Sequence, residues 1–125
     1  MPQQIFLVGH CNIDGPRLQR EISSKLPETD VIRVNSDEDL GRAVESPQAV
    51  LLVNREPVGF DRDGLDIVRD VRESHPNARV MLVSDYEDAQ QEAQDLGALP
   101  GFGKREIGSD SLIERIEEAM QTNAE

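Results

Sequence analysis

The stretch Val50-Leu51-Leu52-Val53, which ends at the polar Asn54, is a continuous apolar run that predicts the fold class. Four other short apolar runs lie along the chain, at 5–8, 31–32, 80–83 and 97–102. These runs are rich in β-branched residues and do not alternate with polar ones, a pattern typical of parallel strands covered on both faces. We therefore expect a parallel sheet buried between helices.

The segments between these runs carry apolar residues at helical spacing, at 18–26, 40–44, 65–71, 89–96 and 112–120. The sequence predicts capping boxes at the start of the second and fifth of them, Ser36-x-x-Asp39 and Ser111-x-x-Glu114. Helix-ending residues follow the first four, namely Pro27, Pro47, Pro76 and Gly97. Strictly alternating strands and helices predict an α/β fold with a doubly wound, five-stranded parallel sheet in three layers.

Length and charge limit the classes of function. The chain has 125 residues, so we expect one domain spanning 1–125 with its core at 3–121. Its formal net charge of -12 disfavours binding to nucleic acid or an anionic membrane. No apolar stretch approaches the roughly 20 residues of a membrane helix, and no signal pattern opens the chain, so we expect a cytoplasmic protein. The single cysteine, Cys11, excludes an intramolecular disulfide.

Polar residues follow the predicted strands, at the edge where doubly wound sheets bind ligands. His10 and Cys11 follow the first strand, Asn54 the third, Ser84 the fourth and Lys104 the fifth. Because these strands are parallel, we expect the five residues to gather at one edge of the sheet.

In this layout the whole chain resembles the receiver domain of bacterial response regulators, which has a flavodoxin-like fold. Receivers carry two acids after the first strand, a phosphoacceptor aspartate after the third, Ser or Thr after the fourth, and Lys after the fifth. Ser84 and Lys104 match this pattern, and Pro57 followed by Asp63-Gly64 resembles the segment after the receiver's third strand. The resemblance implies a stand-alone signalling module of the two-component, or phosphorelay, type.

The departures from the receiver pattern concern its chemistry. Asn54 stands at the phosphoacceptor position, and a neutral amide cannot serve as the nucleophile. His10 and Cys11 replace the acids that would hold magnesium, so we expect weak or absent magnesium binding and no metal or cofactor. Gly101 occupies the position of the aromatic residue that receivers use as a switch, unless Phe102 takes that role. The sequence thus predicts a pseudo-receiver.

Two interpretations remain for the degenerate pocket of His10, Cys11, Asn54, Ser84 and Lys104. Its polar groups satisfy one another and preserve the fold, or Lys104 and Ser84 bind a small anion together with backbone amides. A separate hypothesis makes Glu56 a substitute phosphate acceptor, which requires the third strand to continue beyond Asn54.

An enzyme is the alternative from a different class. His10-Cys11-x5-Arg17 matches the phosphate loop of cysteine-dependent phosphatases and resembles the low-molecular-weight tyrosine phosphatases. In that mechanism Cys11 attacks phosphorus as a thiolate and Arg17 clamps the phosphate. Asp14 and Pro16 weaken the match, since one places a carboxylate in the loop and the other removes an amide donor. We expect no enzyme activity, with this phosphatase as the alternative.

The predicted function is therefore a protein contact. The resemblance implies an interaction surface on the last two helices and last strand, at Tyr86, Gln90, Phe102, Arg105 and Arg115. We expect a signalling partner, either a kinase or an effector, and leave homodimer formation open.

Overall fold

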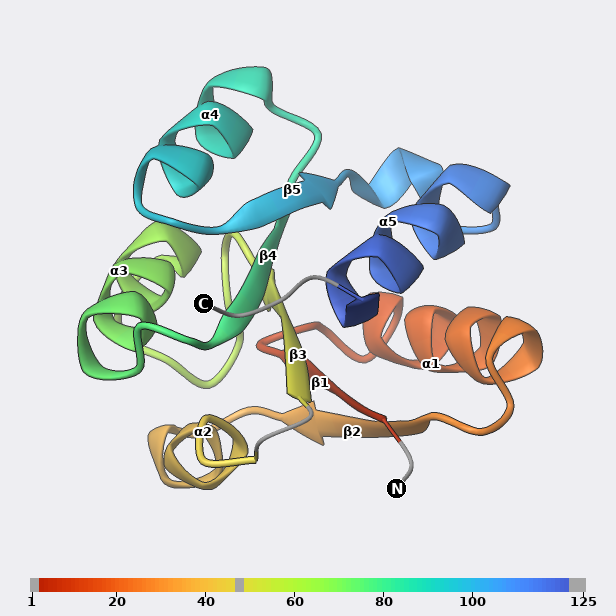
Figure 1. Cartoon of the computed structure of the whole chain (residues 1–125), viewed down its shortest axis with the longest axis horizontal. Coiled ribbons are helices and arrows are strands. Elements are labelled where there is room, and N and C mark those ends of the chain that lie inside the picture. The colour runs from red at the N-terminus through yellow and green to blue at the C-terminus, as the bar shows by residue number, and fades with distance from the viewer. Residues whose placement is uncertain (1–2, 47–48, 122–125) are drawn as a thin grey trace.

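The computed structural model describes residues 3–46 and 49–121. Over these residues, strands and helices alternate along the chain (Figure 1). The strands are β1 (Gln4–Val8), β2 (Asp30–Val34), β3 (Ala49–Asn54), β4 (Arg79–Val83) and β5 (Leu99–Phe102). The α-helices are α1 (Asp14–Lys25), α2 (Asp37–Ala43), α3 (Gly64–Ser74), α4 (Glu87–Asp95) and α5 (Asp110–Gln121), and a short 3-10 helix, η1 (Lys104–Glu106), precedes α5.

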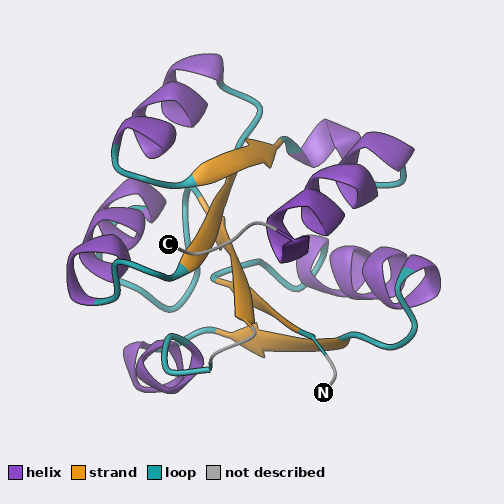
Figure 2. Cartoon of the chain, viewed as in Figure 1, coloured by secondary structure: helices purple, strands orange, loops and turns teal. Residues whose placement is uncertain are grey.

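The strands form one parallel sheet in the order β2-β1-β3-β4-β5. The chain leaves β1 toward β2 and then returns to the other side of β1, so the strand order reverses between β1 and β3. Helices α1 and α5 cover one face and α2, α3 and α4 cover the other (Figure 2). This is the doubly wound three-layer fold that the sequence predicts.

Each buried strand supplies both hydrophobic layers by alternation. In β3, Val50 and Leu52 pack with α1 and α5, whereas Leu51 and Val53 pack with α2, α3 and α4. Strands β1 and β4 divide their side chains in the same way. Continuous apolar runs are required here because both faces of the sheet are covered.

The helix starts confirm one predicted cap and correct the other. Ser36 caps α2, its Oγ accepting from the Asp39 amide at 3.2 Å. The box at Ser111 is wrong, because α5 begins at Asp110 and places Ser111 in its first turn. The Ser111 hydroxyl instead donates to Glu106 Oε1 at 2.9 Å and ties the helix to η1.

Helix ends follow the predicted breakers. Helix α4 is followed by Gly97, whose φ of +104° suits glycine. Pro27 and Pro76 lie just beyond α1 and α3, and Pro47 falls outside the described residues. Among the helices of the described part of the chain, none is long and apolar enough to cross a membrane.

Candidate functional site

The carboxyl ends of β3, β4 and β5 surround a cavity of about 360 Å³, here called the carboxyl-edge cavity. Its lining consists of Asn54, Arg55, Glu56, Val83, Ser84, Asp85, Tyr86, Lys104 and Arg105. Three of the five residues predicted to gather at this edge, Asn54, Ser84 and Lys104, thus line one hollow. His10 and Cys11 lie beyond β1 and are not part of its lining.

Asn54 is fixed to the backbone by its side-chain amide. Its Nδ2 donates to Gly9 O at 3.0 Å and to Glu56 O at 2.9 Å, and the residue is only 3% exposed. Both hydrogen bonds need N–H donors, which an aspartate does not have. The amide therefore joins the loop after β1 to the loop after β3.

His10 is fully buried and bonds the neighbouring strand. Its Nε2 lies 2.8 Å from Leu52 O, so this nitrogen carries the proton. Burial lowers the pKa of His10 to about 4, against a partial upward contribution from the hydrogen bond to Leu52. Nearby Lys104 lowers it further. At neutral pH His10 is an uncharged part of the core edge.

Lys104 finds its counter-ion on α1. Its Nζ lies 3.1 Å from Asp14 Oδ2, and the Asp14 side chain is 15% exposed. Burial raises the pKa of Asp14, but the ion pair with Lys104, helped by Cys11 and Arg17, lowers it below the ordinary value overall. The sequence motif indicates Asp14 only as a carboxylate within a phosphate loop and gives no sign of this ion pair.

The polar groups of the degenerate pocket do not pair with one another. Ser84 Oγ accepts from the Tyr86 amide at 3.2 Å, and Lys104 pairs with Asp14. Over residues 3–46 and 49–121, no hydrogen bond or salt bridge joins any two of His10, Asn54, Ser84 and Lys104. The interpretation that they satisfy one another is wrong, because backbone groups and Asp14 take that place.

Glu56 lines the carboxyl-edge cavity from the loop after β3, which ends at Asn54. The strand extension on which the substitute-acceptor hypothesis depended is therefore absent, yet Glu56 borders the cavity with an exposed side chain. Arg55, which was not among the predicted site residues, also lines it. Its Cζ lies 5.8 Å from the ring centroid of Tyr86.

Gly101 and Phe102 cannot provide an aromatic switch on the surface. A Cβ at Gly101 would lie 2.0 Å from Leu82 O, so only glycine fits there. Phe102 is 1% exposed and packs with residues of α1 and α5. Its assignment to the interaction surface is wrong, because its ring points into the core.

The remaining predicted surface residues differ in availability. Tyr86 is 69% exposed and Arg105 is exposed. Gln90 Nε2 donates to Leu82 O at 2.9 Å and Ser84 O at 3.0 Å. Arg115 Nη1 donates to Gly101 O at 2.8 Å, which covers part of the edge strand β5. Gln90 and Arg115 are thus engaged with the backbone.

The loop that contains Cys11 turns inward on Asp14. The Asp14 amide donates to Cys11 Sγ at 3.4 Å, and the thiol lies 3.6 Å from Asp14 Oδ2. Arg17, the predicted phosphate clamp, lies 3.8 Å from the same carboxyl group. Arg33 holds the loop from β2, donating to His10 O at 2.8 Å and Cys11 O at 3.3 Å. A carboxylate therefore occupies the centre of the phosphatase-like motif.

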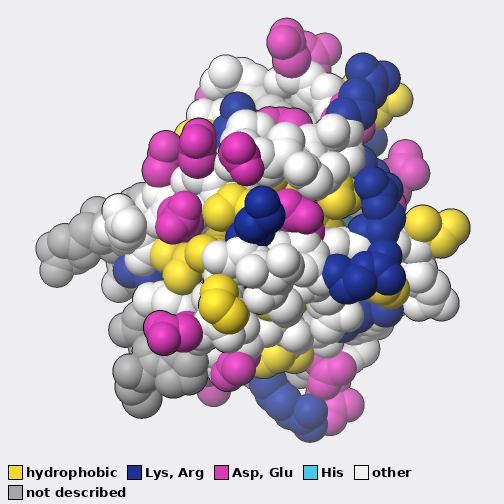
Figure 3. Space-filling model, turned by 90° about the vertical axis from the view of Figure 1, so that its right-hand side faces the viewer, with side chains coloured by type: hydrophobic (Ala, Val, Ile, Leu, Met, Phe, Trp, Pro, Cys, Tyr) yellow, Lys and Arg dark blue, Asp and Glu magenta, His cyan; other side chains and the backbone are white. Residues whose placement is uncertain are grey.

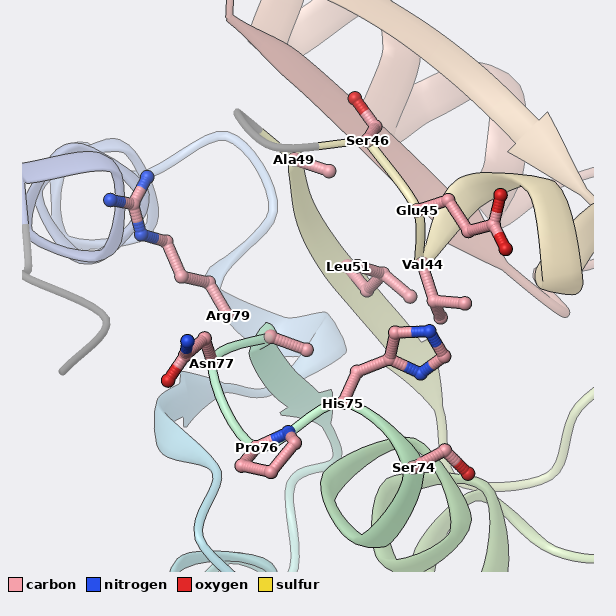
Figure 4. A pocket seen from close by; sticks show the side chains of 11 residues that line it. Val44, Glu45, Ser46, Ala49, Leu51, Ser74, His75, Pro76, Asn77 and Arg79 are labelled. Atoms are coloured by element: carbon pink, nitrogen blue, oxygen red, sulfur yellow. The ribbon is translucent and has the colours of Figure 1, made fainter.

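A second cavity, of about 520 Å³, lies at the opposite edge of the sheet, where β3 and β4 begin (Figure 4). His75 points into it beside Leu51 and Val44, whereas the Arg79 side chain extends away toward α5 (Figure 4).

Comparison with solved structures identifies the fold. The signal receiver domain of a DNA-binding response regulator from Colwellia psychrerythraea 34H is 18% identical, with a TM-score of 0.77 over 96% of this chain and 99% of its own. The receiver domain of NtrX from Brucella abortus is 18% identical, with a TM-score of 0.79 over 97% and 100%.

A response regulator from Burkholderia pseudomallei with a phosphorylated aspartic acid, a calcium ion and citrate is 16% identical, with a TM-score of 0.68 over 98% of this chain and 68% of its own. Searches against protein-family models and against curated proteins find no match. The chain therefore has the fold of response regulator receiver domains, as its sequence layout predicts.

Proposed function

We propose that this protein is a receiver-like signalling module that acts by protein contact and is not phosphorylated at the position of the usual acceptor. The observation that carries the proposal is the buried Asn54, whose Nδ2 donates to Gly9 O and Glu56 O. A neutral amide engaged in this way has no nucleophilic oxygen to offer a phosphodonor. The proposed setting is a two-component pathway in the cytoplasm.

The exposed apolar side chains support a contact surface at the carboxyl edge of the sheet. Ile13, Val58 and Tyr86 are 73%, 50% and 69% exposed. They belong to the loops after β1, β3 and β4, so they all surround the same edge. Exposed large apolar side chains around one edge of the sheet favour a partner surface there. The proposed partner is a signalling protein, either a kinase or an effector.

Phosphatase activity is not part of the proposal. A phosphate in the loop after β1 would meet the Asp14 carboxylate, which already lies against Cys11 and Arg17. A phosphate bound between Cys11 and Arg17 would touch the Asp14 carboxylate directly, and contact between two negative charges disfavours its binding. Cys11→Ser, assayed with an aryl phosphate, tests this directly, because we expect no turnover in either the wild type or the variant.

The deciding experiment incubates the full chain with magnesium and acetyl phosphate and records its intact mass. A receiver with an aspartate acceptor serves as the positive control. We expect an unchanged mass. A hydroxylamine-labile adduct would contradict the proposal and direct attention to a carboxylate such as Glu56, whereas a resistant adduct at Cys11 would favour the phosphatase.

A further inference from the structure

The lining of the carboxyl-edge cavity holds more basic than acidic residues although the protein is strongly acidic, and one of the basic residues, Lys104, is paired with Asp14. The lining contains three basic residues, Arg55, Lys104 and Arg105, and two acidic ones, Glu56 and Asp85, whereas the chain as a whole carries a net charge of -12. Figure 3 shows a row of Lys and Arg side chains along the right-hand edge of the face it presents, with Asp and Glu side chains beside this row and over the rest of the face. Local positive charge of this kind attracts small anions.

Two of the three cations have no counter-ion in the part of the chain that the structure describes. Neither Arg55 nor Arg105 forms a salt bridge within the described residues. Arg55 Nε is buried and has no hydrogen-bond partner in the same part of the chain. Buried N–H groups of this type are normally satisfied, so an external acceptor would complete the site.

One of the two acids of the lining is held by a backbone amide, and the other is exposed. Asp85 Oδ1 accepts from the Arg105 amide at 3.2 Å, which fixes it to the turn that begins η1. Glu56 has an exposed side chain. Ser84 Oγ accepts from the Tyr86 amide, which leaves its hydroxyl proton free to donate to a ligand. The cavity therefore offers a hydroxyl donor together with cationic donors.

Tyr86 adds a flat apolar surface. Its ring is largely exposed and lies beside the guanidinium of Arg55, 5.8 Å from Cζ to the ring centroid. An aromatic ring in this position stacks well against another planar group. The cavity volume of about 360 Å³ lies within the range of pockets that hold small molecules.

We propose that the carboxyl-edge cavity reversibly binds a small molecule in which a phosphate or carboxylate group is joined to a planar ring. The anionic group contacts Lys104, Ser84 and Arg55, and the ring lies against Tyr86. This ligand site goes beyond the proposed function. It rests on that function in one respect, namely that Asn54 carries no phosphoryl group.

The test titrates the full chain with phenylphosphonate, followed by calorimetry and by backbone amide shifts. Methylphosphonate carries the anion without the ring, and benzoate replaces the phosphonate by a carboxylate. The carbon–phosphorus bond resists hydrolysis, so a phosphatase would not consume the probe. We expect saturable binding in which phenylphosphonate or benzoate binds about tenfold more tightly than methylphosphonate. The tighter of the two ring compounds identifies the anionic group.

Matched variants assign the contacts. Arg55→Gln and Lys104→Met should each raise the Kd about tenfold, and Tyr86→Leu should abolish the preference for the ring. Arg69→Gln is the control, since Arg69 lies on α3 outside the cavity lining and its loss changes the net charge equally. Because Lys104→Met also breaks an ion pair with Asp14, Arg55→Gln is the variant that decides.

Three outcomes would overturn the ligand site: no saturable binding, equal weakening in Arg69→Gln, or a ring preference that survives in Tyr86→Leu. Failure of the proposed function is a separate result, since it is a mass increase with acetyl phosphate. A chain that is phosphorylated but still binds phenylphosphonate through Arg55 would refute the proposed function and keep the ligand site.

Discussion

The two halves of the carboxyl edge contrast sharply. Beyond β1 and β3, His10 and Asn54 are buried, and their side chains bond the backbone of neighbouring segments. Beyond β4 and β5, Lys104, Tyr86 and Arg105 border an open cavity, and Arg105 forms no salt bridge with the described residues. At the positions where receivers carry acids, the side chains here are buried and bond the backbone. At the positions where receivers carry Ser and Lys, the side chains border the cavity. Substitutions of the buried His10 and Asn54 should therefore affect stability, and substitutions of the exposed side chains around the cavity should affect binding.

The largest expected effect concerns Gly101, which joins the open half to the core. In Gly101→Ala, the new Cβ would lie 2.0 Å from Leu82 O and 2.8 Å from Gln90 Oε1. The Leu82 carbonyl can move away only if strand β4 shifts. We therefore expect a loss of about 3 kcal/mol or more in the free energy of unfolding, measured by urea titration.

Gly41→Ala is the matched control, since Gly41 lies inside α2 and a Cβ there meets nothing within 4 Å. It should raise the free energy of unfolding by about 0.5–1 kcal/mol. Equal stability of the two alanine variants would show that position 101 tolerates a side chain and could regain a switch residue.

The next effect is the pH dependence that His10 imposes. Its pKa is about 4 in the folded protein and 6.5 in the unfolded chain, so between these values only the unfolded state binds the proton. Stability should therefore fall as pH decreases from 6.5 to 4, with a contribution of about 3 kcal/mol from this residue.

In His10→Gln this contribution should vanish, so the variant's stability should change less over the same pH range. His75→Gln is the comparison variant, since it removes the other histidine of the chain and leaves His10 and its hydrogen bond to Leu52 in place. If His10→Gln retained the wild-type slope, His10 would not be the buried neutral group that the structure describes.

The hydrophobic pattern was sufficient to predict the sheet, because burial on both faces leaves a continuous apolar run in each central strand. It also predicted that Asn54, Ser84 and Lys104 meet, since parallel strands end at one edge. Phe102 was placed on the surface by the resemblance and not by the pattern, because it ends an apolar run that predicts a buried strand.

The ion pair of the site was missed for a different reason. Asp14 and Lys104 are brought together only by the three-dimensional packing of α1 beside η1, and spacing along one sequence carries no signal for it. Arg33 likewise reaches the loop after β1 from the neighbouring strand. A search for a carboxylate able to neutralise Lys104 would have given several candidates, because Glu56 and Asp85 follow strands at this edge as Asp14 does.

A smaller effect should follow from Asn54→Asp, which restores the acid that receivers carry. The carboxylate would face Gly9 O and Glu56 O, which accept hydrogen bonds from Nδ2 in the native protein. We expect a loss of about 2 kcal/mol in the free energy of unfolding at pH 7. Asn12→Asp is the control, because exposed Asn12 already accepts from Arg33 with its oxygen and should be nearly unaffected. A fully stable Asn54→Asp would mean that the hydrogen bonds of Asn54 to Gly9 O and Glu56 O are not needed for the fold, and that an acid is tolerated at this position.

The smallest effect separates the ion pair from the fold. Lys104→Met removes the partner that lowers the pKa of Asp14, so this pKa should rise toward its ordinary value, which NMR of the carboxyl carbon measures. Since Lys104 is 40% exposed, the stability loss at pH 7 should stay below about 1 kcal/mol. A lowered carboxyl pKa stabilises the fold above the ordinary pKa of aspartate, so the loss of stability should disappear as pH falls through the lowered pKa of Asp14.

Lys25→Met is the control, because its partner Asp110 is 91% exposed and lies 3.9 Å away. A larger loss of stability in Lys104→Met would mean that Lys104 is needed for the fold. An unchanged Asp14 pKa would mean that Lys104 does not pair with Asp14 in solution.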